Sequence, residues 1–413
     1  MITHQKYSVI LGVCLLTFVS TIHPVYAQDL TDLIHMGLKQ NPNVINADLH
    51  YQLATEQVHE AHVIPNTDIS LGYFVSEPET RTGPQKFKAS VTQMLPWFGT
   101  VTARENYATS LAEAQYENIA ISQRKLVLSI SQNYYQLWAI TEKQQVLQEQ
   151  YAILKRFETL ALASVGVGKA SAVDVLKLQM RQNEIEAQKQ LLEQDYLGVQ
   201  TKINSDLNRH TSESITVTST LEIPTENILQ VEKVTPVHPE LLQYDKLYAS
   251  VEQSELLNQK NSAPMLGFGL DYIAIAERQD ETLVDNGKDV IMPMFTVSIP
   301  IFNTSYASKT KQHELQKDIY KTQKTEKMNG LISVLDVAVK QRKSARISYE
   351  TQIKNINQAK HAQDILMKSY ETGSIDFDAV LEIQDLQLTY EIRAIEATMA
   401  YYNQQTLINY ITQ

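Results

Sequence analysis

The chain has 413 residues, with 13 glycines, 12 prolines and a formal net charge of −11. Scarce glycine and proline favour long helices, and the negative charge argues against a nucleic-acid partner because phosphates would repel it. The single cysteine excludes an internal disulfide. The sequence contains no P-loop, no nucleophile elbow and no Cys/His metal cluster, so we predict neither an enzyme nor a cofactor.

Residues 1–27 have the pattern of a secretory signal peptide. Lys6 gives a positive start, residues 9–19 are apolar, and Ala27 closes a short segment suited to cleavage. Cys14 lies in a weak resemblance to a lipoprotein box that lacks the small residue before the cysteine, so lipidation is not predicted. No later segment has about eighteen consecutive apolar residues, so any membrane span in the mature chain must be β.

Residues 29–62 are predicted to form one helix, because Asp29 suits an N-cap and the following leucines lie near one face. A β-hairpin is predicted over residues 66–96. Its two strands alternate apolar residues with small or polar ones, which is typical of strands with one apolar face. The apolar residues are Ile69, Leu71, Tyr73, Val75, Phe87, Ala89, Val91 and Leu95.

Residues 101–165 contain neither glycine nor proline, and as one helix they would extend roughly 95 Å. Leucines and isoleucines at three-and-four spacing predict a coiled-coil seam along this helix. The segment VGVGKAS then breaks the helix, and Ser171 with Asp174 resembles a capping box that opens a second one. Residues 209–236 are rich in threonine and serine and favour short β structure.

The same order of elements restarts in the second half of the chain. A helix is predicted from His238, followed by a β-hairpin over residues 264–300, a long helix after Pro300 and a last helix. The strands of this hairpin again alternate apolar residues with small residues or methionines. Four strands of bilayer length cannot close a barrel, so several chains would have to share one.

Matching features at nearly constant spacing indicate a tandem duplication. Gly168 and Gly373 lie 205 positions apart, and Pro96 and Pro300 lie 204 positions apart. Such self-similarity at a fixed offset is the signature of an internal repeat. The predicted organisation is a signal peptide at 1–27, a first structural repeat at 28–220 and a second structural repeat at 221–413.

Each hairpin ends in a proline that precedes a long helix. Pro96 is followed by Gly99, and Pro300 is followed by Asn303. Proline cannot donate a ladder hydrogen bond, and its fixed φ suits the first turn of a helix. Glycine and asparagine tolerate unusual backbone angles. We therefore predict a strand-to-helix junction at each of these two segments.

These motifs, taken in order, resemble a known family. The segments QMLPWFGT and VSIPIFNT are similar to the strand-to-helix junctions of TolC-type outer-membrane efflux proteins, and SVGVGKASAVDVL and YETGSIDFDAVL resemble the family's helix-hairpin turns at the periplasmic tip. The resemblance covers about residues 28–413, and LPWFG is similar to members that serve cation efflux. It implies a mainly α fold with a β-barrel, in which a homotrimer shares one barrel above a long coiled-coil tunnel.

The resemblance also implies a function and partners. The barrel would lie in outer-membrane lipid, and the helices would cross the periplasm towards an adaptor protein and an inner-membrane pump. The adaptor-facing tips would include Gly166, Gly168, Ser171, Gly373 and Ser374. The protein would be a passive export duct for metal cations or small toxic compounds. Two alternatives are a channel for protein secretion or multidrug export, and a periplasmic coiled-coil scaffold whose hairpins bind proteins.

In the family, acidic residues near the tip can ring the tunnel, and this chain has several acids there. Glu382 matches one family position, whereas Ala379 stands at the other; Asp376, Asp378 and Asp174 lie nearby. Repeated carboxylates around a narrow axis would select cations and repel anions. The alternative roles are helix capping for Asp174 and Asp376 and a solvated helix face for Glu382.

Two sets of side chains have weak metal-binding potential. Met292 and Met294 are predicted to face the lumen, and thioethers suit copper(I), although methionine is also a common apolar filler. His59 and His62 stand at i and i+3 on a predicted helix, but they do not form HExxH. For the two histidines a structural or surface role is favoured, and no metal site is assigned.

Overall fold

The computed structural model describes residues 29–166, 171–217, 220–225, 237–279, 284–372 and 374–413. The predicted signal peptide lies outside these ranges. In the described part of the chain, no helix combines the length and apolarity needed to cross a membrane. The elements are α1 (Leu30–Gln40), α2 (Pro42–Ala61), β1 (Thr67–Tyr73), β2 (Glu79–Thr80), β3 (Gly83–Leu95), α3 (Thr100–Gly166), α4 (Ala172–Asp206), α5 (Pro239–Asn261), β4 (Met265–Ile275), β5 (Val290–Ser298), α6 (Ser305–Glu371) and α7 (Phe377–Thr412).

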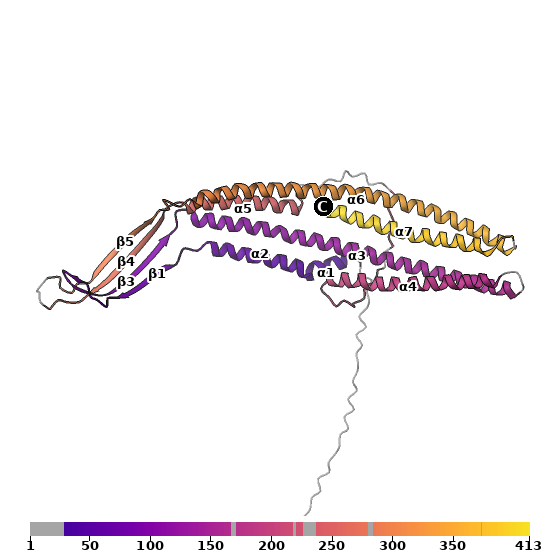
Figure 1. Ribbon diagram of the computed structural model, residues 1–413, viewed down its shortest axis with the longest axis horizontal. Helices are drawn as coiled ribbons and strands as arrows, with labels where there is room; N and C mark the ends of the chain where they lie inside the picture. The colour runs from indigo at the N-terminus through magenta and orange to yellow at the C-terminus, as the bar shows by residue number, and fades with distance from the viewer. Residues whose placement is uncertain (1–28, 167–170, 218–219, 226–236, 280–283, 373) are drawn as a thin grey trace, which may run out of the picture.

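The molecule is long and narrow, with a small sheet at one end and the tips of two helix hairpins at the other (Figure 1). The order of helix, paired strands, 67-residue helix and shorter helix occurs twice along the chain. This confirms the predicted fold class of long helices with four main strands. The assignment of repeats to residues 28–220 and 221–413 stays a prediction.

The sheet is antiparallel in the order β1-β3-β4-β5, with β1 and β5 at its edges. Residues paired across strands lie on the same face of a sheet. One row joins Ile69, Val91 and Leu270, and the neighbouring row joins Asp68, Thr92 and Gly269. The predicted alternation is therefore confirmed within the strands, since one face is mainly apolar and the other carries mainly small or polar side chains and methionines. Val75, which was expected in the first strand, lies beyond the end of β1 at Tyr73.

The helices form a single layer of four lanes. The long helix α3 packs against α2 and α4 on one side and against α5 and α7 on the other, and α6 packs against α5 and α7. The lanes thus run α2/α4, α3, α5/α7 and α6, and the outer lanes lie on the same sides as the edge strands β1 and β5 (Figure 1). The predicted seam is buried on α3 at Leu126, Ile130, Leu137, Ile140, Leu147 and Leu154.

Two expectations were wrong. Residues 29–62 form two helices rather than one, because the residue before a proline avoids the helical region and Asn41, with ψ at 125°, is extended ahead of Pro42. The described residues between 209 and 225 form no strand. Their carbonyls are used by side chains instead: the amide Nδ2 of Asn204 donates to the carbonyl oxygens of Thr211 and Glu213, each at 2.8 Å.

Two buried side chains hold the joints where short helices meet end to end. Asn41, 4% exposed, accepts from the backbone N–H of Asn43 at 2.9 Å, which caps α2, and donates from Nδ2 to the carbonyl of Asp206 at the end of α4 at 2.8 Å. His238, 1% exposed, accepts at Nδ1 from the N–H of Glu240, which caps α5. Its Nε2 donates to the carbonyl of Tyr410 in α7 at 3.1 Å.

The joint at His238 requires a neutral imidazole, because Nδ1 can accept only when it carries no proton. Burial lowers the pKa of His238, the hydrogen bond to Tyr410 opposes that change, and the neighbouring charges of Arg124 and Lys327 lower the pKa while Glu240 raises it. The net effect is a pKa below its ordinary value of 6.5. The folded protein therefore favours the capping form of the ring.

We expect the melting temperature to fall as the pH drops below 6.5, because the unfolded imidazole then binds a proton that the folded one does not. His238→Ala should cost about 2 kcal/mol near neutral pH and should flatten this dependence. His238→Asn supplies one acceptor and one donor, so it should keep most of the stability without the pH dependence. Circular dichroism melts over about pH 5 to pH 8 measure both effects. An unchanged pH dependence in His238→Ala would contradict the assignment.

Candidate functional site

The tips of the two helix hairpins lie together at the end of the molecule away from the sheet (Figure 1). At the start of α4 the Oγ of Ser171 accepts from the N–H of Val173, and the carboxylate of Asp174 accepts from the N–H of Ser171 at 3.2 Å. Asp174 thus completes a capping box. Gly166 and Ser374 are exposed, whereas Gly168 and Gly373 lie outside the described residues.

Ion pairs connect α4 of the first hairpin to α7 of the second. Lys177 lies 2.6 Å from Asp378, and this hydrogen bond raises the pKa of the lysine. One turn further on, the guanidinium of Arg181 contacts both carboxylate oxygens of Asp385. Bidentate pairs of this kind fix the relative position of the two groups as well as attracting them. These ion pairs fix the register of the two hairpins at the tip, and Phe377 and Val380 of α7 pack in the same apolar cluster as Val175 and Leu178 of α4.

The other two acids of the predicted constriction have different surroundings. Asp376 stands at the N-cap position of α7, yet its side chain makes no capping hydrogen bond. Glu382 is exposed on α7, and among the described residues it has no ion pair or hydrogen bond. Asp376 and Glu382 thus keep free carboxylates near the tip, whereas Asp174 and Asp378 are engaged within the chain.

A buried carboxylate between α3 and α4 was not predicted. Glu158 is 6% exposed and accepts hydrogen bonds from Lys155 at 2.8 Å, Gln179 at 2.8 Å and Gln182 at 3.1 Å. The hydrogen bond from Lys155, followed by those of the two glutamines, lowers the pKa of Glu158 to about 2. The sequence carried a signal for this site, because Glu158 stands four residues after Leu154 in the apolar seam.

The two strand-to-helix junctions use different devices. Pro96 follows β3 directly and Pro300 lies two residues after β5, ahead of α3 and α6. Gly99 has a φ of +81°, which a side chain would disfavour. The expectation of an unusual backbone at Asn303 was wrong: its Oδ1 instead accepts from the N–H of Ser305 at 3.0 Å, so asparagine serves here as a cap.

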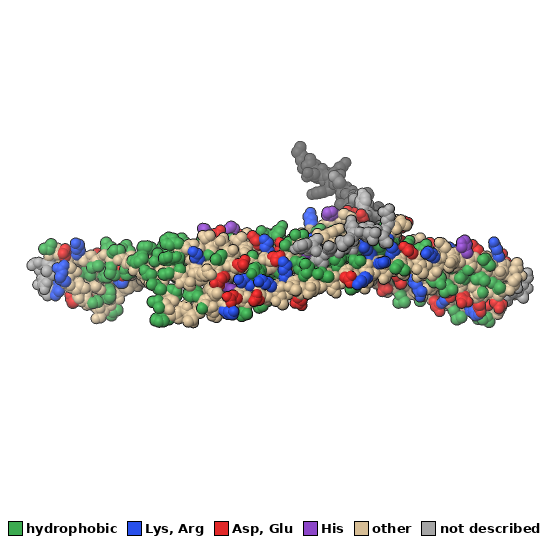
Figure 2. All heavy atoms as spheres, turned by 90° about the horizontal axis from the view of Figure 1, so that it is seen from above, with side chains coloured by type: hydrophobic (Ala, Val, Ile, Leu, Met, Phe, Trp, Pro, Cys, Tyr) green, Lys and Arg blue, Asp and Glu red, His purple; other side chains and the backbone are tan. Residues whose placement is uncertain are grey.

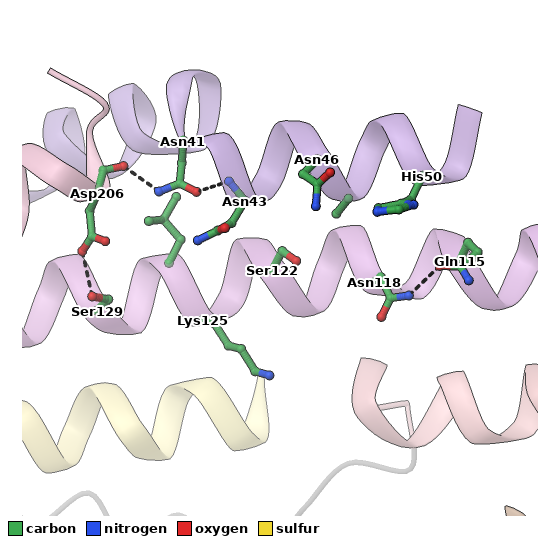
Figure 3. Close-up of a pocket in the computed structure, with 12 residues that line it drawn as sticks. Asn41, Asn43, Asn46, His50, Gln115, Asn118, Ser122, Lys125, Ser129 and Asp206 are labelled. Atoms are coloured by element: carbon green, nitrogen blue, oxygen red, sulfur yellow. Dashed lines mark hydrogen bonds between the residues drawn. The ribbon is translucent and has the colours of Figure 1, made fainter. Parts of the chain in front are cut away.

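A polar groove of about 530 Å³ lies between α2 and α3 (Figure 3). Carboxamides and hydroxyls dominate its wall, and Asp206 is bonded to Ser129 at 2.7 Å. Lys125 reaches towards Glu240 at 3.7 Å. A wall of this kind can hydrogen-bond water and polar solutes without holding a strong charge. Its polar members are Asn41, Asn43, Asn46, His50, Gln115, Asn118, Ser122, Lys125, Ser129 and Asp206.

The described residues contain no group of three or more His, Cys, Asp or Glu side chains placed to hold a metal ion. His59 is exposed on α2, and His62 pairs with Glu105 at 3.0 Å on the surface. Met292 and Met294 lie on the small and polar face of the sheet, in the same rows as Asp271 and Gly269. Metal binding by these two methionines stays a prediction.

Three solved outer-membrane proteins share this fold over nearly the whole chain. VceC from the bacterial pathogen Vibrio cholerae is 15% identical with a TM-score of 0.72, covering 93% of this chain and 96% of its own. The CmeC outer membrane channel of Campylobacter jejuni is 15% identical with a TM-score of 0.73, covering 93% and 85%. CusC, whose structures concern transmembrane channel formation, is 12% identical with a TM-score of 0.77, covering 94% and 95%.

The fold of the chain is therefore that of outer-membrane channels. In addition, residues 33–205 match the family model described as outer membrane efflux protein. No curated protein matches the sequence significantly. The family match lies within the first half of the chain, and the shared fold extends the likeness through the second half.

We expect Glu158→Gln to destabilise the tip by about 2 kcal/mol at neutral pH, because a charged hydrogen-bond acceptor is lost from a buried position. The pKa of Glu158 is lowered from 4.5 to about 2, so its contribution is present above pH 4.5 and is lost as the pH falls to about 2. Melting temperatures at several pH values measure the difference, which should vanish in acid. Glu382→Gln is the matched control and should leave stability unchanged.

Proposed function

We propose that the protein is the outer-membrane channel subunit of a tripartite efflux system, a passive duct rather than an enzyme. One observation carries this proposal: the chain is a strip with two open edges and one apolar face at its sheet end. A single chain of this shape does not enclose a passage. Joined edge to edge with copies of itself, it encloses a passage along its whole length.

The apolar face of the sheet supports a position of the sheet in the lipid of the outer membrane. Side chains of this face are largely uncovered, for example Ile69 at 70% and Phe295 at 61% exposure. Apolar side chains also gather over the strand-to-helix junctions (Figure 2). An exposed apolar area of this extent marks an interaction surface, and an outer membrane supplies the matching solvent. The helices would then extend into the periplasm.

The two edges support assembly from several copies. The edge strands β1 and β5 leave backbone groups unpaired, which a neighbouring strand can satisfy. The outer helix α2 carries an uncovered row at four-residue spacing, in which Leu49 is 55% and Leu53 is 56% exposed. The opposite outer helix α6 carries a further uncovered apolar set, which includes Leu315 and Ile319. If the β1 edge of one chain pairs with the β5 edge of the next, repeated joining closes a ring. Twelve strands from three chains would leave a lumen.

The helical tips support contact with a periplasmic adaptor and, through it, with an inner-membrane pump. They are the part of the molecule farthest from the sheet (Figure 1). The free carboxylates of Asp376 and Glu382 lie there, so three copies would place several negative charges near one axis. Such a ring would favour the passage of cations, so the proposed substrates are metal cations or small toxic compounds.

Two other functions remain as alternatives. A channel for protein secretion or multidrug export would use the same duct with a different pump. A periplasmic coiled-coil scaffold would use the helices alone, and its hairpins would not enter a membrane. Fractionation of cell envelopes separates the scaffold from the two channels, because only a channel would accompany the outer membrane.

We expect the purified protein to give steady cation-selective conductance in a planar bilayer. Glu382→Gln should lower the cation-to-anion permeability ratio by about two-fold or more, because a ring of charges is neutralised. Lys354→Gln changes one charge on α6 well away from the tip and serves as the control. If Glu382→Gln leaves the permeability ratio unchanged, the constriction must be formed by other residues. Folded protein that never conducts would favour the scaffold.

We expect Leu49→Lys to prevent assembly, because a lysine in the uncovered row of α2 would place a desolvated charge against the next chain. Leu49→Met keeps an apolar side chain of similar size and should assemble normally. The mass of the detergent-solubilised particle, measured by light scattering, separates the two results. Equal trimer content in both variants would show that this row is not an interface.

A further inference from the structure

A second groove between α2 and α3, the tyrosine groove, has a volume of about 590 Å³, and its lining includes Tyr51, Tyr116, Glu113 and Glu117. Tyr116 lines the tyrosine groove, whereas Asn118 lines the polar groove. Residues two apart on a helix point in directions about 200° apart, so the two grooves open on opposite faces of the helical layer. A cavity of this size is typical of sites for small ligands.

Two aromatic rings form a corner in the tyrosine groove. Tyr51 of α2 and Tyr116 of α3 meet edge to face, with ring centroids 5.3 Å apart and an angle of 67° between the ring planes. Tyr116 is 55% exposed, so a ligand can reach its ring. The face of an aromatic ring carries partial negative charge and attracts a cation within about 6 Å of its centre. The corner therefore offers a cation an apolar surface with favourable electrostatics.

Two carboxylates of α3 lie within one helical turn of this corner. Glu113 stands three residues before Tyr116, Glu117 follows it directly, and both glutamates line the groove. Side chains at i and i+4 are neighbours on a helix, and like charges there repel each other. Lys246 of α5 offsets only part of this repulsion, because it pairs with Glu113 at 2.9 Å. The two glutamates and the lysine together leave one net negative charge in the groove.

The second of these carboxylates lacks a direct partner. Glu117 is half-buried, and among the described residues it forms no hydrogen bond or ion pair. Burial raises the pKa of its carboxyl group, and the charge of Lys246 opposes this change without reversing it. Taking a carboxylate out of water without a partner costs free energy. A cation that enters the groove would recover part of this cost, so the groove favours a positively charged ligand.

The walls of the groove favour an organic cation over a metal ion. Val58 and Ala112 add apolar surface beside the two rings. A metal ion needs several ligand atoms to replace its water, and the described residues contain no group of three or more His, Cys, Asp or Glu side chains placed to hold one. An alkylammonium ion spreads its charge over methyl or methylene groups, which pack against aromatic rings and still attract a carboxylate.

The tyrosine groove opens on the face of the layer that carries the segment after α4. Val217 and Leu221 of this segment pack against the apolar cluster that contains Trp138 of α3. Trp138 lies 22 residues, or about six helical turns, beyond Tyr116, so both side chains lie on the same face of α3. In the proposed channel, a segment crossing the inward face would obstruct the passage. The face with the groove would therefore point outward, into the periplasm.

We propose that Tyr51, Tyr116 and Glu117 form a binding site for a small alkylammonium ion on the outer face of the helical layer. The two rings contact the cationic head, and the carboxylate balances its charge. Glu113 stays paired with Lys246. This inference goes beyond the proposed function, because the site lies within one chain and outside the passage. Its failure would leave the channel unaffected, and a protein that never conducts could still bind the ion.

The test is a titration of the purified protein with choline, followed by saturation-transfer NMR. The protein is kept in a maltoside detergent, because a detergent with a choline head group would fill the site. The uncharged probe is the alcohol in which a carbon atom replaces the nitrogen of choline, so that the shape is kept and the charge is lost. We expect the alcohol to bind about three-fold or more weakly than choline. Equal affinity for the two probes would overturn the site.

Variants of the ring and of the carboxylate locate the binding. Glu117→Gln should weaken choline binding by about three-fold or more, whereas Glu326→Gln, on the exposed surface of α6, is the matched control and should bind as the native protein does. Tyr116→Leu should lose the transfer to the choline methyl groups, and Tyr116→Phe, which keeps the ring, should retain it. Equal choline affinity in the two glutamine variants, or equal transfer in the two variants of Tyr116, would overturn the assignment.

Discussion

The continuity of the helical layer depends on two buried side chains. Each of them accepts one hydrogen bond and donates another where two helices meet end to end. The two 67-residue helices run without a break, whereas their neighbours are shorter helices stacked end to end. Such a joint exposes N–H groups of one helix and carbonyls of the other. Asn41 and His238 satisfy both kinds of group at once, since each offers one acceptor and one donor. The layer therefore stays continuous over roughly 100 Å.

The single-layer arrangement leaves both sides of the chain without a neighbouring element. In the described part of the chain the helices contact one another within a single layer, so the outer lanes and the edge strands have a free side. A globular protein would fold such a layer over a second one to bury its apolar rows. Here the rows on α2 and α6 stay uncovered, and the sheet presents its apolar face outward. In the proposed channel, copies of the same chain would supply the missing neighbours.

Much of the fold could be predicted from local patterns, because helix periodicity, strand alternation and capping boxes are encoded within a few residues. The long helices, the faces of the strands and the cap formed by Ser171 and Asp174 were all foreseen in this way. The break at Asn41 was missed although the proline that follows it is a local signal, and the buried Glu158 was missed because its glutamine partners come from the neighbouring helix α4. Asn303 was misjudged because asparagine suits both an unusual φ and a cap, and only the backbone decides between them.

The charges at the tip show what divergence between the two halves achieves. If the halves are copies offset by 205 positions, Lys177 corresponds to Glu382 and Asp378 corresponds to Val173. Two copies of the first half would set Lys177 against a valine, and two copies of the second half would set a glutamate against Asp378, so no ion pair would join them. Instead, α4 carries the cations Lys177 and Arg181, and α7 carries Asp378 and Asp385, so the hairpins attract each other. Glu382 is exposed on α7 and takes no part in this pairing, so in the proposed channel its carboxylate would be available to a passing cation.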